Sequence, residues 1–209
     1  MFARTNYWWW ITAVLSTAVA SYSIGMLLFP GLRTPFVANL VDSNMGVAFS
    51  HFGGSAVALI TGSLQLHRQI RLKSPNVHRW LGRLYLVGVA FGSVSGGVMS
   101  LKASGGAAAQ WGFLLLTICW VLFSLGGYIH KRFNNIIAHR RWMTRSFALT
   151  FGAVTLRVYL PIALLSGYSF DDVYPIIAWA AWLPNLILVE VALTINERRS
   201  LKLRAARSV

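Results

Sequence analysis

Six stretches of roughly twenty apolar residues divide the chain, and this pattern constrains its fold more than any other feature. They cover residues 8–29, 47–66, 79–100, 111–129, 146–166 and 174–195. A helix of about 20 apolar residues spans the hydrocarbon core of a bilayer, which is about 30 Å thick. Only 11% of the 209 residues are charged and 56% are hydrophobic, too few polar side chains to cover a water-facing globule. The sequence therefore predicts an all-α polytopic transmembrane bundle of six helices.

The connections between these stretches are short and contain no low-complexity linker, so we expect one integral membrane domain over residues 1–209. Residues 196–209 form its basic tail. The N-terminus resembles a signal peptide, because Arg4 precedes an apolar run that contains the small residues Ala18 and Ala20. That run continues unbroken to Phe29, so we expect the first helix to be retained rather than cleaved.

The formal net charge of +14 is distributed very unevenly along the predicted topology. Arg33 and Lys102 fall on one side of the membrane and Arg157 falls within it, whereas the other 16 basic residues share the opposite side. The positive-inside rule predicts an inner-membrane protein with that side and both termini in the cytoplasm. Anionic lipid headgroups are then the expected partners of the basic residues, and nucleic acid is not. A protein partner or a homo-oligomer remains open.

Two hairpins carry the same pattern of histidines next to basic residues. His67 ends the second apolar stretch and His78 precedes the third, while His130 ends the fourth and His139 precedes the fifth. This spacing predicts a parallel internal repeat, in which helices two and three match helices four and five. The repeat would gather these four histidines in one neighbourhood.

Small residues recur every four positions on helices two and three and predict where these helices pack closely. His51 has nearly the same helical phase as the small residues of its helix, so it should face the bundle interior. We also expect Pro161 in helix five, and Pro184 with Asn185 in helix six, to kink their helices. The recurring small residues are Gly54, Ala58, Gly62, Gly88, Gly92 and Gly96.

Three strings resemble a bacterial family of predicted inner-membrane proteins, domain of unknown function 2306. They are HFGG at residues 51–54, PNVHRWLGRLY at 75–85, and HRRWMTRSFALT at 139–150 continuing to Arg157. The resemblance covers roughly residues 47–165 and implies a small polytopic membrane protein without assigned chemistry. More distantly, the paired histidines resemble the haem ligands of two-haem b-type membrane cytochromes, although His51 has no histidine partner at its end of the bundle.

The candidate cofactor site contains His78 and His139, because neutral imidazole is a good ligand for haem iron, copper or zinc. Glu190 is expected at a similar depth, as a further metal ligand, second-shell acceptor or counter-ion. The alternative is that these histidines and their basic neighbours extend toward lipid headgroups.

His51 and Arg157 are ionisable residues inside the membrane, where such groups usually face a cavity or the bundle interior. His51 is a candidate axial haem ligand or proton acceptor, and Arg157 a candidate partner of a haem propionate, a quinone or an anionic substrate. Alternatively, Arg157 bonds carbonyl groups freed near Pro161, and His51 is a hydrogen-bonded interior histidine. Methionines near His51 also suit Cu(I), namely Met26, Met45 and Met99.

The sequence contains no nucleotide-binding, zincin or nucleophile-elbow motif and does not decide whether the protein is an enzyme. Cys119 has no cysteine partner and is expected to contribute packing. Three hypotheses remain: a haem- or metal-binding membrane redox protein, a small-solute transporter, and a non-catalytic scaffold or assembly factor.

Overall fold

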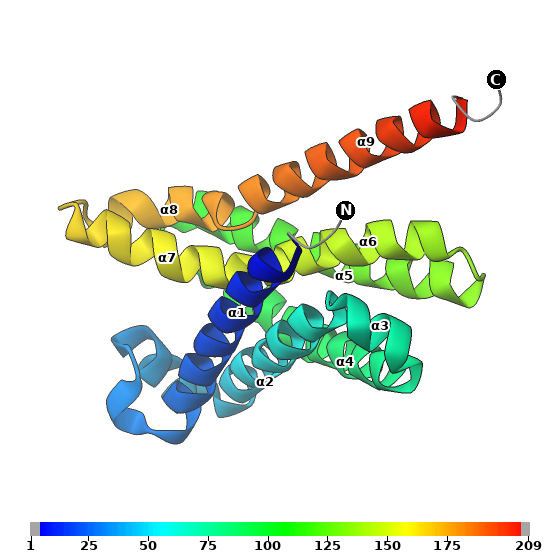
Figure 1. Ribbon diagram of the computed structural model, residues 1–209. Helices are drawn as coiled ribbons and strands as arrows, with labels where there is room; N and C mark the ends of the chain where they lie inside the picture. Colours follow the sequence, from blue (N-terminus) through cyan, green and yellow to red (C-terminus); the bar gives the residue numbers. More distant parts are fainter. Residues whose placement is uncertain (1–4, 206–209) are drawn as a thin grey trace.

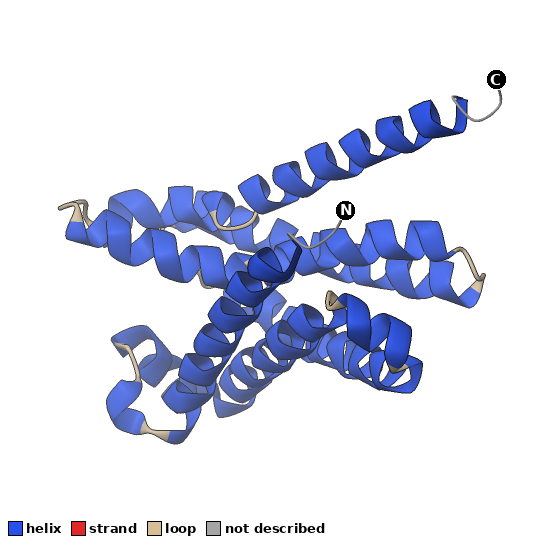
Figure 2. Ribbon diagram, viewed as in Figure 1, coloured by secondary structure: helices blue, strands red, loops and turns tan. Residues whose placement is uncertain are grey.

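The computed structural model describes residues 5–205, and helices account for nearly all of them (Figures 1 and 2). No strand occurs within this range. The elements are α1 (Thr5–Leu28), the short 3-10 helix η1 (Pro30–Leu32), α2 (Pro35–Gln65), α3 (Arg68–Lys73), α4 (Pro75–Ser100), α5 (Gly106–Arg132), α6 (Ile136–Thr150), α7 (Gly152–Leu165), α8 (Phe170–Ala180) and α9 (Leu183–Ala205).

Six candidate membrane spans lie within residues 5–205, which confirms the predicted all-α bundle. The first four spans lie in α1, α2, α4 and α5, whereas each of the last two consists of two consecutive helices, α6 with α7 and α8 with α9. Most of the helices extend by several residues beyond the predicted apolar stretches, because polar and basic residues continue the helices past the apolar core. Residues 196–205 of the predicted tail continue α9, and the remaining four lie outside the described part.

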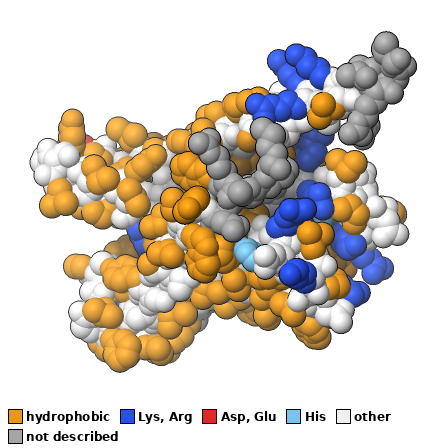
Figure 3. Space-filling view, viewed as in Figure 1, with side chains coloured by type: hydrophobic (Ala, Val, Ile, Leu, Met, Phe, Trp, Pro, Cys, Tyr) orange, Lys and Arg blue, Asp and Glu red, His pale blue; other side chains and the backbone are white. Residues whose placement is uncertain are grey.

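One end of the bundle, here called the basic end, is where α2 and α5 end and α4 and α6 begin. Figure 3 shows Lys and Arg side chains gathered over this end, while apolar side chains cover most of the remaining visible surface. Figure 1 places the last turns of α9 beyond the body of the bundle at the same end. Arg4, Arg204 and Arg207 are also predicted on this side of the membrane, and their side chains lie outside the part of the chain that the structure describes.

Helices α2 and α4 cross with their backbones almost in contact. A Cβ atom added to Gly54 would lie 2.8 Å from the Gly92 amide nitrogen, and one added to Gly88 would lie 2.7 Å from the Gly54 carbonyl oxygen. Ala58 is fully buried in the same crossing. The predicted packing of small residues on these two helices is therefore confirmed, and it determines how closely the two helices that carry His51 and His78 approach each other.

Three breaks interrupt the spans. The backbone of Asn44 is extended (φ −158°), and its side chain accepts a bond from the Val47 amide, so a new helix begins near the predicted boundary at residue 47. Helix six breaks between Ala180 and Leu183, next to the predicted Pro184, which lacks the amide that would bond the Ala180 carbonyl. Helix five has a one-residue interruption at Phe151, where the backbone keeps right-handed helical angles (φ −67°, ψ −14°), while Pro161 lies within α7.

Candidate functional site

The basic end brings His78 close to several cations. His78 lies in the first turn of α4, and its electrostatic neighbours are Arg71 on α3, His139 and Arg140 on α6, and Lys131 on α5. Burial lowers the pKa of Arg71 from its ordinary value, and the charges of Arg140 and Arg68 lower it further. The ends of α3, α4, α5 and α6 thus bring a cluster of basic side chains together.

His139 has a defined tautomer. Its Nδ1 lies 2.8 Å from the carbonyl oxygen of Gly127, and a carbonyl oxygen can only accept a hydrogen bond. Nδ1 therefore carries the hydrogen, and in the neutral ring the lone pair is on Nε2. This arrangement, in which one ring nitrogen donates to a backbone carbonyl, is common among histidines that ligate metals.

The other two histidines of the basic end pack against tryptophan rings, His67 in a tilted arrangement and His130 in a stacked one. The ring centroids of His67 and Trp9 are 4.4 Å apart, and those of His130 and Trp142 are 6.1 Å apart. Trp9 also donates its indole N–H to the Ser63 carbonyl at 2.9 Å. These contacts favour a packing role for His67 and His130, while the predicted internal repeat stays a prediction.

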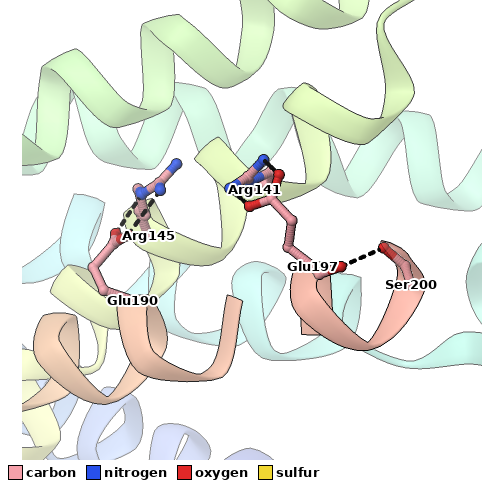
Figure 4. Close-up of polar contacts among 5 residues, drawn as sticks. All are labelled: Arg141, Arg145, Glu190, Glu197 and Ser200. Carbon is pink, nitrogen blue, oxygen red and sulfur yellow. Dashed lines mark hydrogen bonds and ion pairs between the residues drawn. The ribbon is translucent and has the colours of Figure 1, made fainter. Parts of the chain in front are cut away.

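Glu190 pairs with an arginine rather than with a histidine (Figure 4). Arg145 on α6 donates to both of its carboxylate oxygens, with Nη2 2.8 Å from Oε2. One turn earlier on α6, Arg141 makes the same two-point contact with Glu197 of α9. Both glutamates therefore attach α9 to α6. Among residues 5–205 no three His, Cys, Asp or Glu side chains converge on a metal site, and the predicted site of His78, His139 and Glu190 stays a prediction.

Arg157 and His51 lie within electrostatic range of each other in the bundle interior. Arg157 donates to the Ala153 carbonyl at 3.0 Å and to the Ser23 hydroxyl of α1 at 3.1 Å. The carbonyl that Pro161 deprives of an amide is that of Arg157 itself, so the side chain bonds a different group from the one predicted. No carboxylate of the described residues pairs with Arg157.

His51 faces the interior, as predicted. Its Nδ1 lies 3.1 Å from the Gly92 carbonyl, so by the same reasoning Nδ1 is the donor and Nε2 is free to bind a proton or a ligand. A Cβ added to Gly96 would lie 3.3 Å from the imidazole, so this glycine makes room for the ring. Met26 and Met99 belong to a neighbouring apolar cluster, whereas Met45 is exposed, and the predicted copper site stays a prediction.

The breaks in the last two spans touch each other. A Cβ added to Gly152 would lie 3.2 Å from the Ala181 carbonyl oxygen, so the two interruptions meet at one depth. The amide of Asn185 donates to Thr155 at 2.9 Å and to the carbonyls of Ala181 and Ala148 at 3.2 and 3.4 Å. One side chain therefore links both broken helices. Arg157 follows on α7, about one and a half turns beyond Gly152.

A buried network of hydroxyl groups joins α4, α5 and α6, and sequence analysis missed it. Tyr85 is fully buried, and its hydroxyl lies 2.6 Å from Ser146 and 2.7 Å from Thr150. Ser124 lies 2.6 Å from Ser146, and the indole of Trp120 donates to Thr150 at 2.9 Å. No local pattern around Tyr85 marks this network, because the hydroxyl groups that its side chain meets come from another helix, α6.

The two best-defined grooves are small and apolar. One, of about 190 Å³, lies between α4 and α5, and the other, of about 260 Å³, lies between α2 and α4. Neither is lined by a histidine or an arginine. Figure 3 shows a wider hollow between the α7–α8 hairpin and the outer turns of α1 and α2, with a Lys or Arg side chain visible in it. Cys119 packs against the central apolar cluster, as predicted.

Comparison with known proteins agrees with the fold. A family model described as a predicted membrane protein, DUF2306, matches residues 48–193, which is more than half of the chain. No curated protein and no solved structure shows significant similarity. The matched region runs from α2 to α9 and includes His51, His78, His139, Arg157 and Glu190. The chain therefore belongs to the DUF2306 family of predicted membrane proteins.

Proposed function

We propose that the bundle carries a small anion across the membrane and that Arg157 binds it. The observation that carries this proposal is an interior arginine that has no carboxylate partner among residues 5–205, next to helix interruptions at Phe151 and at residues 181–182 that contact each other. Discontinuous helices that meet near the middle of the membrane are typical of substrate sites in secondary transporters. Transport is one of the three hypotheses that the sequence leaves open, and the contact between the two interruptions favours it.

The energetics of Arg157 support an anionic ligand. A guanidinium near the bilayer centre costs about 2.5–3.5 kcal/mol even on insertion scales that allow for snorkelling. Its hydrogen bonds to Ala153 and Ser23 satisfy two donors but leave the positive charge uncompensated. A bound anion would neutralise that charge and accept hydrogen bonds from the guanidinium N–H groups that these two bonds leave free.

His51 supports a role for protons in the same process. Its free Nε2 can take up a proton, while Arg157 within electrostatic range opposes a second positive charge. An anion bound to Arg157 would remove part of this repulsion, so anion binding and His51 protonation would favour each other. We therefore propose that His51 carries a proton together with the anion.

The test is anion uptake into proteoliposomes that contain the purified full-length protein. Chloride, nitrate and acetate are supplied outside with an inward proton gradient, and internal anion and internal pH are both recorded. We expect Arg157→Met to lower uptake at least tenfold, since it removes a charge-assisted bond. We expect His51→Gln to uncouple uptake from pH.

Lys102→Met is the matched control, because it also removes one cation. Lys102 is exposed on the loop after α4, outside the bundle interior. Uptake by this variant should equal that of the wild type. Uptake by Arg157→Met at the wild-type rate, in protein with an unchanged unfolding temperature, would refute the proposal.

A haem-binding redox protein is the second candidate, with His78 and His139 as ligands. The tautomer of His139 supports it, since Nε2 is the atom left to bind iron. The surrounding cations favour haem over bare copper or zinc, because haem carries two propionates whereas a metal ion would be repelled. The fit is incomplete, since neither groove reaches these histidines. Oxidised and reduced visible spectra together with metal analysis test this candidate, and a protein without haem bands or stoichiometric metal eliminates it.

We also propose that the basic end faces the cytoplasm and that the protein lies in an inner membrane. The concentration of Lys and Arg at that end supports this orientation (Figure 3). Reporter domains fused to either terminus should be active only in the cytoplasm. A periplasmic signal from either fusion contradicts the topology.

A further inference from the structure

Two polar atoms at the basic end are buried without a hydrogen-bond partner among the described residues. They are Nε of Arg71 on α3 and Nδ1 of His78 on α4. Buried polar groups nearly always have partners, because an unsatisfied one costs about 1–3 kcal/mol. The consecutive helices α3 and α4 that carry them are in contact, and the charge of Arg71 acts on His78, so both unsatisfied groups lie in the same part of the basic end.

The charged side chains that act on this site are basic ones. Arg140 is an electrostatic neighbour of both Arg71 and His78, Arg68 adds charge to the Arg71 side, and Lys131 adds charge to the His78 side. The chain has only five acidic residues. Both glutamates pair with Arg141 and Arg145, and no carboxylate is an electrostatic neighbour of Arg71 or His78.

We propose that Arg71, His78 and Arg140 form a binding site for a phosphate group at the membrane surface. A phosphate supplies several acceptor oxygens and one to two negative charges, which match two unsatisfied groups within a cluster of cations. The planar guanidinium of Arg71 suits two-point contact with such a group. This proposal does not depend on transport through Arg157, which lies in a different part of the bundle.

The position of the site suggests two sources for the phosphate. α3 is a six-residue helix that connects α2 to α4 at the basic end, where lipid headgroups would lie beside it. A phosphomonoester lipid headgroup could therefore enter from the bilayer, and free phosphate could enter from water. The same residues would bind either, so the experiment has to distinguish the two sources.

The experiment measures binding to delipidated full-length protein in an uncharged detergent by titration calorimetry. The probes are inorganic phosphate, short-chain phosphatidic acid and short-chain phosphatidylcholine. We expect wild-type protein to bind at least one of the first two probes and to bind phosphatidylcholine more weakly. Arg71→Met should weaken that binding about tenfold or more, and His78→Phe and Arg140→Met should also weaken it.

Arg83→Met is the charge-matched control. Arg83 also lies near the start of α4, but it stacks on Trp80, with 4.7 Å from its guanidinium carbon to the ring centroid, and it is not an electrostatic neighbour of His78. If Arg71→Met does not fold, Arg140→Met carries the test, because Arg140 is exposed.

Each outcome decides a point. Binding of both probes, with losses in the site variants only, supports the site and allows either source. Binding of phosphatidic acid alone identifies a lipid headgroup, and binding of inorganic phosphate alone identifies a soluble ligand. The proposal is overturned if neither probe binds, or if Arg83→Met weakens binding as much as the site variants do, since the interaction would then reflect net charge alone.

Discussion

Neighbouring glycines on α2 should respond in opposite ways to the same substitution. A Cβ at Gly54 would lie 2.8 Å from the Gly92 nitrogen and 3.0 Å from the Gly88 carbonyl oxygen, both on the backbone of α4. These atoms cannot rotate away, so α2 and α4 would have to separate. A Cβ at Gly53 would meet no atom within 4 Å. Gly53→Ala therefore changes helix propensity alone, whereas Gly54→Ala also disrupts the crossing.

The size of the difference follows from two opposing effects. Alanine is favoured over glycine within a helix by about 1 kcal/mol, and this gain is common to both variants. Overpacking a close contact costs about 1–3 kcal/mol and applies only to Gly54→Ala. At about 2–4 °C per kcal/mol for a domain of this size, Gly54→Ala should unfold about 2–12 °C below Gly53→Ala.

Thermal unfolding of both variants in one detergent, followed by tryptophan fluorescence, measures this difference. The wild type should unfold below Gly53→Ala, and it should unfold above Gly54→Ala unless the overpacking cost only cancels the gain in helix propensity. Equal unfolding temperatures for the two variants, or a higher one for Gly54→Ala, would show that the helices do not approach as closely as described.

Three further predictions concern the polar contacts. Tyr85→Phe removes the hydroxyl at the centre of the buried network and should lower the free energy of unfolding by about 1 kcal/mol, whereas Tyr128→Phe, at an exposed tyrosine, should not change it. Glu190→Gln should cost less than about 1 kcal/mol and the loss should shrink in high salt, because the side chains of Arg145 and Glu190 are 19% and 44% exposed. Asn185→Leu leaves the carbonyls at both breaks without their shared donor and should lower the unfolding temperature, while a wild-type unfolding temperature would show that the breaks need no such link.

The spans and the helix crossing could be predicted from sequence because their signals are local. Membrane helices need about 20 apolar residues in succession, and small residues at four-residue intervals mark one face of one helix. The interior position of His51 follows from the same periodicity. The pairing of Glu190 could not be found in this way, since Arg141 and Arg145 lie one turn apart on α6 and only the packing of α9 on α6 decides which arginine each glutamate meets.

The interruption at Phe151 also could not be predicted from the sequence. Proline is the strongest signal for an interrupted helix, and it predicted the break near Pro184 correctly. No proline lies near Phe151, where Thr150 and Thr155 instead bond the carbonyls of Ser146 and Phe151 one turn earlier. Such back-bonding bends helices only when the tertiary environment favours it, and here Asn185 of another helix completes the arrangement.

The contacts fix the central helices to one another and also hold the α7–α8 hairpin against them. Backbone contacts at Gly54 and Gly88 fix α2 on α4, and the hydroxyl network of Tyr85 fixes α4 to α5 and α6. The α7–α8 hairpin has one interruption at each of its ends, at Phe151 and at residues 181–182. Asn185 links the two interruptions. This hairpin is itself held on α5, since the Trp179 indole donates to the Ala108 carbonyl at 3.0 Å and a Cβ added to Gly112 would lie 3.0 Å from the Ala178 side chain. A change in the distance from Arg157 on α7 to His51 on α2 therefore requires α8 to separate from α5, so anion binding at Arg157 would be coupled to His51 through their electrostatic interaction rather than through a free rotation of the hairpin.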